Sequence, residues 1–119
     1  MKFDNTGIEN QTVDLSRLNS LMEDLGFVLA GQWDYERATY DRKFETKGEV
    51  FYLRVQGYAI EGEIDSNHAV VKILAPLLGK HYYPHGVEYG EGETFPKSLI
   101  EQSQKLIAQI KEGIEHINQ

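Results

Sequence analysis

The sequence predicts an α+β fold: a single two-layer domain in which an N-terminal helix and a long C-terminal helix pack on a mainly antiparallel sheet of four to five strands. Three observations predict this fold. The 119 residues are about the size of one folded domain. Helical periodicity occurs near the two ends of the chain, and the segments between them alternate with a period of two. No helical stretch separates consecutive strands, and a parallel pair would need such a crossover.

The first helix is predicted between Thr12 and Gly26. Apolar residues recur there at helical spacing and give the segment one apolar face. They are Leu15, Leu18, Leu21, Met22 and Leu25. Thr12 or Asp14 can cap the start, because both side chains accept hydrogen bonds from the free N–H groups of a first turn. Gly26 can end the helix, since glycine adopts the left-handed conformation at little cost.

Alternation with a period of two predicts strands at residues 27–33 and 37–45. In the second segment polar and less polar residues alternate sharply, so one face of this strand should be hydrated. The turn chemistry of residues 46–49, with Gly48 available for a positive φ, precedes a further strand at 50–56. So short a connection makes these two strands antiparallel.

The segment 68–75 is almost continuously apolar, which favours a central place in the sheet. Residues 58–64 either extend the preceding strand or add a fifth. The first residues, 3–8, can pair at an edge of the sheet.

The last helix is predicted from Pro96 to Asn118. Its apolar residues form one wide stripe. They are Leu99, Ile100, Leu106, Ile107, Ile110, Ile114 and Ile117. The helix starts either around Pro96 after Thr94 or at a capping box made by Ser98 and Glu101. The stripe favours a helix lying on the sheet over a short coiled coil, because Gly113 and few flanking charge pairs weaken the heptad pattern.

Composition excludes several classes of function. Lys and Arg number 12 against 19 Asp and Glu, a net charge of −7, which argues against binding to nucleic acid or to an anionic membrane surface. The absence of cysteine removes disulfides, thiolate zinc sites and cysteine nucleophiles. No apolar run is long enough for a membrane helix, and the first residues lack the features of a signal peptide. The sequence therefore predicts a cytoplasmic protein, and no cofactor is predicted.

The connection from Pro76 to Phe95 is the first candidate site. It is long, and all three prolines of the chain lie between Pro76 and Pro96. Long structureless connections in compact domains tend to bind or catalyse. Tyr82, Tyr83 and Tyr89 are binding candidates here, and we expect their rings to pack within an ordered loop. The alternative is a purely structural loop in which the same rings are buried against the domain.

Two histidines in this connection invite a metal or acid-base hypothesis. His81, His85 and Glu88 carry groups that bind metals or transfer protons near neutral pH. We expect His81 and His85 to lie near one another, or near Glu88, at the rim of a pocket. Pro84 and Gly86 make a helix improbable, so the spacing fixes no ligand geometry. A metal site would need a third ligand, such as His68 or Asp65, brought in by the fold. We therefore predict no metal site.

A second group of binding candidates lies on the two strands after the first helix. Trp33, Tyr35, Arg37 and Arg42 interleave aromatic rings with charge. An arginine stacked on a ring and paired with a carboxylate makes either a rigid structural network or a face that recognises a ligand. His68 is a further candidate at the start of a strand.

Three strings resemble the YugN-like family of small bacterial proteins. They are GQWDYERATYDRKF (residues 31–44), YLRVQGYAIEGEID (52–65) and LGKHYYPHGVEY (78–89), and the opening MKFDNTGIEN is also similar. The resemblance extends over nearly the whole chain. It implies one domain and a bacterial cytoplasmic setting, and it transfers no catalytic residue.

The sequence contains no recognised catalytic motif. Its wide apolar helix stripe and its aromatic-rich connection suit a binding surface. The leading hypothesis is a small non-enzymatic binding or regulatory module, whose partner is a small molecule, a protein or a second copy in a homodimer. The alternative is a small hydrolase or metal-assisted enzyme that uses His81, His85 and Glu88.

Overall fold

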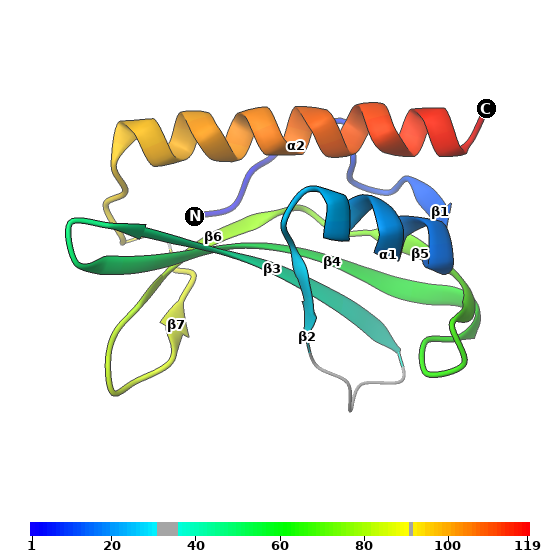
Figure 1. The fold of residues 1–119 in the computed structure, drawn as a ribbon, viewed down its shortest axis with the longest axis horizontal. Coiled ribbons are helices and arrows are strands. Elements are labelled where there is room, and N and C mark those ends of the chain that lie inside the picture. Colours follow the sequence, from blue (N-terminus) through cyan, green and yellow to red (C-terminus); the bar gives the residue numbers. More distant parts are fainter. Residues whose placement is uncertain (31–35, 91) are drawn as a thin grey trace.

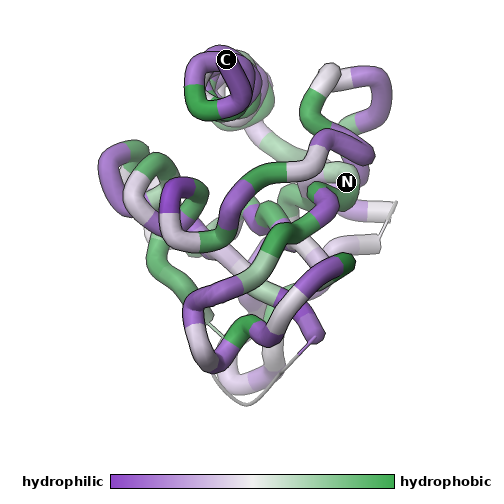
Figure 2. Tube along the Cα trace, turned by 90° about the vertical axis from the view of Figure 1, so that its right-hand side faces the viewer, coloured by the Kyte–Doolittle hydropathy of each residue, from purple (hydrophilic) through white to green (hydrophobic). Residues whose placement is uncertain are grey.

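In the computed structural model, which describes residues 1–30, 36–90 and 92–119, two helices lie on one face of an antiparallel sheet (Figure 1). The elements are β1 (Thr12–Asp14), α1 (Leu15–Asp24), β2 (Val28–Ala30), β3 (Arg37–Thr46), β4 (Glu49–Glu63), β5 (His68–Ile73), β6 (Leu77–His81), β7 (Val87–Glu88) and α2 (Lys97–Ile117). Figure 2 shows the layers from the side, with α2 seen along its axis above the strands. The predicted α+β class is confirmed.

The sheet is built around β4, which is 15 residues long. Along one edge β4 pairs with β3, and along the other it pairs first with β6 and then with β5, always antiparallel. The strands run in the order β1-β5-β4-β3-β2, with β6 and β7 joined to the first half of β4. Residues 58–63 extend β4, as one of the two expectations had it, and β5 lies beside this central strand.

The described chain has seven strands, more than the four to five expected. β1 is three residues long and runs directly into α1, so it is too short to show the alternation that predicts a strand. β6 and β7 occupy the connection 76–95 that the sequence suggested was structureless. Its glycines and prolines are typical of loops, and the strand pairing that overrides this local composition comes from β4.

A two-residue turn fixes the register of the β3–β4 hairpin. Lys47 and Gly48 both have positive φ, 50° and 78°, as in the turns whose twist matches that of paired strands. The pairing that follows places Asp41 opposite Arg54 and Lys43 opposite Tyr52. The predicted turn is therefore confirmed, and it decides which side chains meet across the sheet.

Both helices begin near the predicted positions. The Asp14 side chain caps α1 by accepting a hydrogen bond from the backbone N–H of Arg17 at 3.2 Å. Pro96 occupies the cap position of α2, and its carbonyl accepts from the N–H groups of Leu99 and Ile100. No side chain caps α2, so the helix starts at the Pro96 alternative rather than at the Ser98 capping box.

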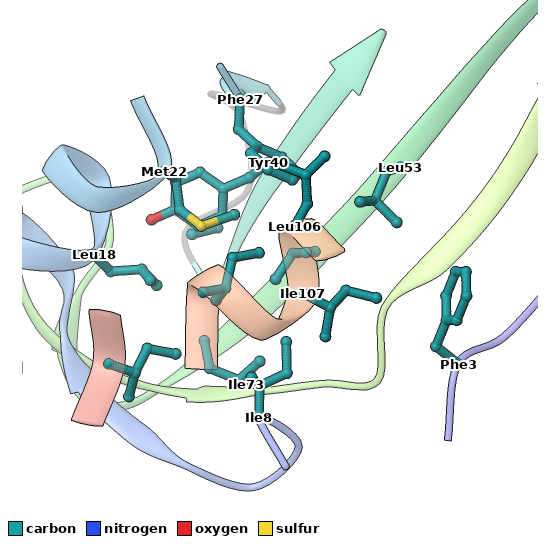
Figure 3. Close-up of a cluster of buried hydrophobic side chains, with 14 of the residues drawn as sticks. Phe3, Ile8, Leu18, Met22, Phe27, Tyr40, Leu53, Ile73, Leu106 and Ile107 are labelled. Atoms are coloured by element: carbon teal, nitrogen blue, oxygen red, sulfur yellow. The ribbon is translucent and has the colours of Figure 1, made fainter. Parts of the chain in front are cut away.

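The core lies between the helices and the sheet (Figure 3). The stripe of α2 packs there as favoured, with Leu106 and Ile107 over the strands. Gly113 lets α1 approach, because a Cβ at this position would lie 2.5 Å from Cδ1 of Leu21. Within the described chain, neither helix is long and apolar enough to span a membrane.

Candidate functional site

Neither helix lies on the other face of the sheet, the side on which the β6–β7 hairpin projects (Figure 1). Alternation along β4 buries Phe51, Leu53 and Val55 toward the helices and leaves the residues between them half-buried on the other side. We call this second side the open face. Its β4 residues are Tyr52, Arg54, Gln56 and Tyr58, with neighbours from β3 and β6. The face is therefore polar and aromatic, and it takes no part in the core.

A clamped arginine occupies its centre. Nε and Nη2 of Arg54 donate to the two carboxylate oxygens of Asp41 at 2.9 and 3.0 Å. The guanidinium carbon also lies 4.9 Å from the centroid of the Tyr89 ring. The hydrogen bonds to Asp41 raise the pKa of Arg54, although partial burial opposes this effect. A two-pronged carboxylate contact and a ring on one flat side hold the guanidinium in one orientation.

Tyr89 lies directly on the backbone of Gly79. A Cβ at residue 79 would lie 2.6 Å from Cδ1 and Cε1 of the Tyr89 ring and 2.6 Å from Cγ1 of Val87. The phenol oxygen is buried and makes no hydrogen bond within the described chain. Burial, supported by the negative charge of Asp41, raises the pKa of Tyr89 to about 12, and nearby Arg54 opposes the rise. The Tyr89 ring can therefore pack directly on the β6 backbone because residue 79 has no side chain.

Two further rings complete the cluster. The Tyr52 and His81 rings meet edge to face, with centroids 6.4 Å apart and an interplanar angle of 80°. Tyr52 pairs with Gly79 across the strands, so its side chain and Tyr89 lie on the same face at the same level. We call Asp41, Tyr52, Arg54, His81 and Tyr89 the Arg54 cluster.

The open face continues to a hollow of about 620 Å³ at its other end, lined by Arg37, Tyr58 and Leu74 among others. The amide of Gln56 donates to the Thr39 hydroxyl at 3.1 Å between the hollow and the Arg54 cluster. The open face therefore extends along β4 from Tyr52 to Tyr58.

The predicted loop of residues 76–95 is only partly as expected. Tyr89 packs, whereas the Tyr83 ring is 90% exposed, so the expectation of a packed ring is wrong for Tyr83. Tyr82 is also exposed, at 36%, so the expectation is wrong for Tyr82 as well, and its ring lies 5.0 Å from the Lys80 ammonium. The β6–β7 pairing explains the difference, because it points Tyr89 inward over Gly79 and leaves residues 82–86 as the tip of a hairpin.

The metal hypothesis needed three ligands at one point. Among the described residues, no three His, Asp or Glu side chains are grouped closely enough to hold a metal ion. His81 pairs with Val50 at the start of β4, whereas His68 pairs with Glu63 at its end. His85 and Glu88 are exposed on the β6–β7 hairpin. The fold thus keeps His81, His85 and Glu88 on one hairpin and places His68 at the other end of β4, with Asp65 in the turn that precedes it.

The two described binding candidates on β3, Arg37 and Arg42, lie on opposite faces of the sheet. Arg37 lies on the open face opposite Tyr58. Arg42 points to the helix side, with its guanidinium 5.2 Å from the centroid of the Phe44 ring. Trp33 and Tyr35 lie outside the described residues.

Three members of the Arg54 cluster were missed by sequence reasoning: Asp41, Tyr52 and Arg54. The turn between β3 and β4 could have predicted their pairing from the sequence. A two-residue turn at Lys47 and Gly48 places residues whose numbers sum to 95 opposite each other, which pairs Asp41 with Arg54. The aromatic and charged alternation of β3 and β4 therefore contains these three members of the cluster once the turn is assigned.

Comparison with known proteins gives a consistent set of relatives. A model of the YugN-like family matches residues 4–112. The uncharacterized protein YlbA of Bacillus subtilis is 54% identical over 110 residues, 92% of each chain. The uncharacterized protein YugN of the same organism is 30% identical over 98 residues, 82% of this chain and 72% of that protein. The crystal structure of the uncharacterized conserved protein YugN from Geobacillus kaustophilus matches with a TM-score of 0.88 at 60% identity, covering 99% of this chain and 98% of that one.

Proposed function

The chain belongs to the YugN-like family, and we propose that it works as a small non-enzymatic binding module whose open face receives a protein or peptide. The observation that carries the proposal is the clamped Arg54. Arginine and tyrosine are the side chains most often found at the energetic centres of protein interfaces. Here an arginine and two tyrosines gather on the sheet face that neither helix covers.

The clamp prepares Arg54 for binding. A flexible arginine loses rotamer freedom when a partner orders it, and this cost reduces affinity. Asp41 and Tyr89 already hold the guanidinium in place. Within the described chain, two of its five N–H donors bond to Asp41, so the others can reach a carboxylate or backbone carbonyl of a partner.

Site-specific photocrosslinking tests the proposal. The full chain carries the photoreactive residue p-benzoylphenylalanine either at Tyr52, on the open face, or at Lys105, on the exposed side of α2. In Bacillus cells, irradiation should give a discrete heavier adduct from position 52 and none from position 105. Arg54→Ala should remove the adduct. Equal adducts from both positions, or an adduct indifferent to Arg54→Ala in a protein that still melts cooperatively, would count against the open face as the binding surface.

A further inference from the structure

Basic side chains gather on the open face. Four of the 12 basic residues of the chain lie there, either within residues 52–58 of β4 or directly opposite them on a neighbouring strand. They are Arg37, Lys43, Arg54 and Lys72. At the same positions the described strands contribute one acidic side chain, Asp41, which is bound to Arg54. This stretch is therefore basic, in a chain whose net charge is −7.

The basic residues form two groups along β4. Lys43 and Arg54 make up the first group. Arg37 and Lys72 make up the second, in which they pair with Tyr58 from its two sides. The four residues from Arg54 to Tyr58 span roughly 13 Å, because a strand rises about 3.3 Å per residue. Two residues that lie four apart in an extended peptide have the same spacing and point to the same side.

Lys72 has the greatest capacity to bind a carboxylate from outside. Within the described chain it makes no ion pair. Arg54 and Lys43, by contrast, are bound to Asp41 and Glu45, each at 2.9 Å. Lys72 is also half-buried between its neighbours in the sheet. A carboxylate that reaches it gains more than at a fully exposed lysine, because partial burial weakens screening by water.

We infer that the partner of the open face is an acidic, extended segment of a protein that lies along β4. The inference rests on the function proposed above and names the chemistry of the partner. A basic stretch on an acidic protein steers carboxylates toward it and disfavours basic partners. Beside the basic groups, the hollow lined by Tyr58, Ala59 and Leu74 can take an apolar side chain of the same segment.

The face suits carboxylates better than the phosphates of a nucleic acid. Glu45 lies beyond one end of the basic stretch and Glu63 beyond the other, so both ends repel a longer polyanion. Stacking of bases needs an open ring face. The Tyr89 ring already contacts the Gly79 backbone and the Arg54 guanidinium. A short segment with a few carboxylates therefore fits the open face better than a chain of phosphates.

Fluorescence anisotropy of the full chain with three labelled probes tests the inference. The probes are a short peptide with two glutamates four residues apart and tyrosines between them, the same peptide with glutamines in place of the glutamates, and oligothymidylate. The acidic peptide should bind at least about 10-fold more tightly than the neutral one. Lys72→Glu should weaken its binding by about 10-fold. Lys105→Glu, on the exposed side of α2, makes the same change in net charge and should alter the binding by less than about twofold.

Lys43→Glu, at a side chain 52% exposed, repeats the charge reversal at a more exposed position, and circular dichroism confirms that each variant is folded. No binding of the acidic peptide, equal binding of the acidic and neutral peptides, equal losses in Lys72→Glu and Lys105→Glu, or tighter binding of oligothymidylate would each overturn the inference.

The photocrosslinking adduct from position 52 separates this inference from the proposed function. The adduct should disappear in Lys72→Glu and persist in Lys105→Glu. An adduct that persists in folded Lys72→Glu would overturn the acidic partner and leave the open face as a binding surface. No adduct from position 52 in the otherwise unchanged chain would overturn both.

Discussion

Replacing Gly79 by alanine tests whether Tyr89 rests on β6 as described. The added Cβ would lie 2.6 Å from two atoms of the Tyr89 ring and from one of Val87, about 1 Å closer than carbon atoms pack. The ring and the β7 backbone must therefore move outward. Overpacking of this kind costs about 1–3 kcal/mol, and the lower chain entropy of alanine returns about 0.4–1 kcal/mol. The net loss should be about 1–2 kcal/mol in urea denaturation, or a melting temperature roughly 3–10 °C lower.

Gly86→Ala is the matched control in the same hairpin. No atom lies within 4 Å of a Cβ at residue 86, so stability should change by less than about 0.5 kcal/mol. In a Tyr89→Ala background the cost of Gly79→Ala should fall by at least about 0.5 kcal/mol, because the ring that it displaces is gone. A Gly79→Ala protein as stable as Gly86→Ala would show that the ring does not lie on Gly79 and that the Arg54 cluster is not assembled this way.

Three further predictions concern the core, a cap and a buried phenol. Ile107→Ala, at a position 3% exposed, should lower the free energy of unfolding by about 2–5 kcal/mol in denaturant melts, whereas exposed Gln109→Ala should change it by under about 0.5 kcal/mol. Hydrogen bonds from the Ser16 hydroxyl and from the backbone N–H of Arg17 lower the pKa of Asp14. The stability by which wild type exceeds Asp14→Ala, roughly 1 kcal/mol, should therefore be largest above pH 3.8 and should decrease as the pH falls through the lower folded pKa. Equal losses at pH 2 and pH 7 in denaturant melts would contradict this. The pKa of Tyr89 is raised from 10.0 to about 12, so the stability that depends on its neutral form should be present below pH 10.0 and lost toward pH 12. In an ultraviolet titration of tyrosinate, Tyr89→Phe should remove one step at high pH. An unchanged titration curve would contradict the burial of Tyr89.

The parts of the fold that sequence reasoning predicted are those with a long repeating pattern. α2 shows its stripe over six turns, and the β3–β4 hairpin shows alternation on both sides of a glycine turn. β6 and β7 have neither advantage. They are short, they lie among glycines and prolines, and β6 is held by pairing with β4, which is about 25 residues earlier in the chain. Only the tertiary pairing makes them strands.

The candidate site likewise combines one contact that is local in the sequence with one that joins distant segments. The contact between Asp41 and Arg54 is local to one hairpin, and the turn alone would have located it. The contact of Tyr89 with Arg54 joins β4 to the end of a second hairpin, and it exists only because Gly79 leaves room for the ring. A composition rich in tyrosine does not distinguish Tyr89, which packs, from Tyr83, which projects into solvent. Predicting the site from sequence therefore required the pairing of β6 with β4.

The Arg54 cluster lies on a part of the sheet where stability does not require it. The core lies on the opposite face, and its large buried side chains come from the helices and from the alternate residues of the strands. Burial removes water from the phenol oxygen of Tyr89, and the half-buried arginine loses hydration as well. Threonine or valine at these strand positions would hold the sheet together without those costs. Because local rules are broken here and obeyed in the core, the composition of the cluster favours the proposal that the open face is a binding surface.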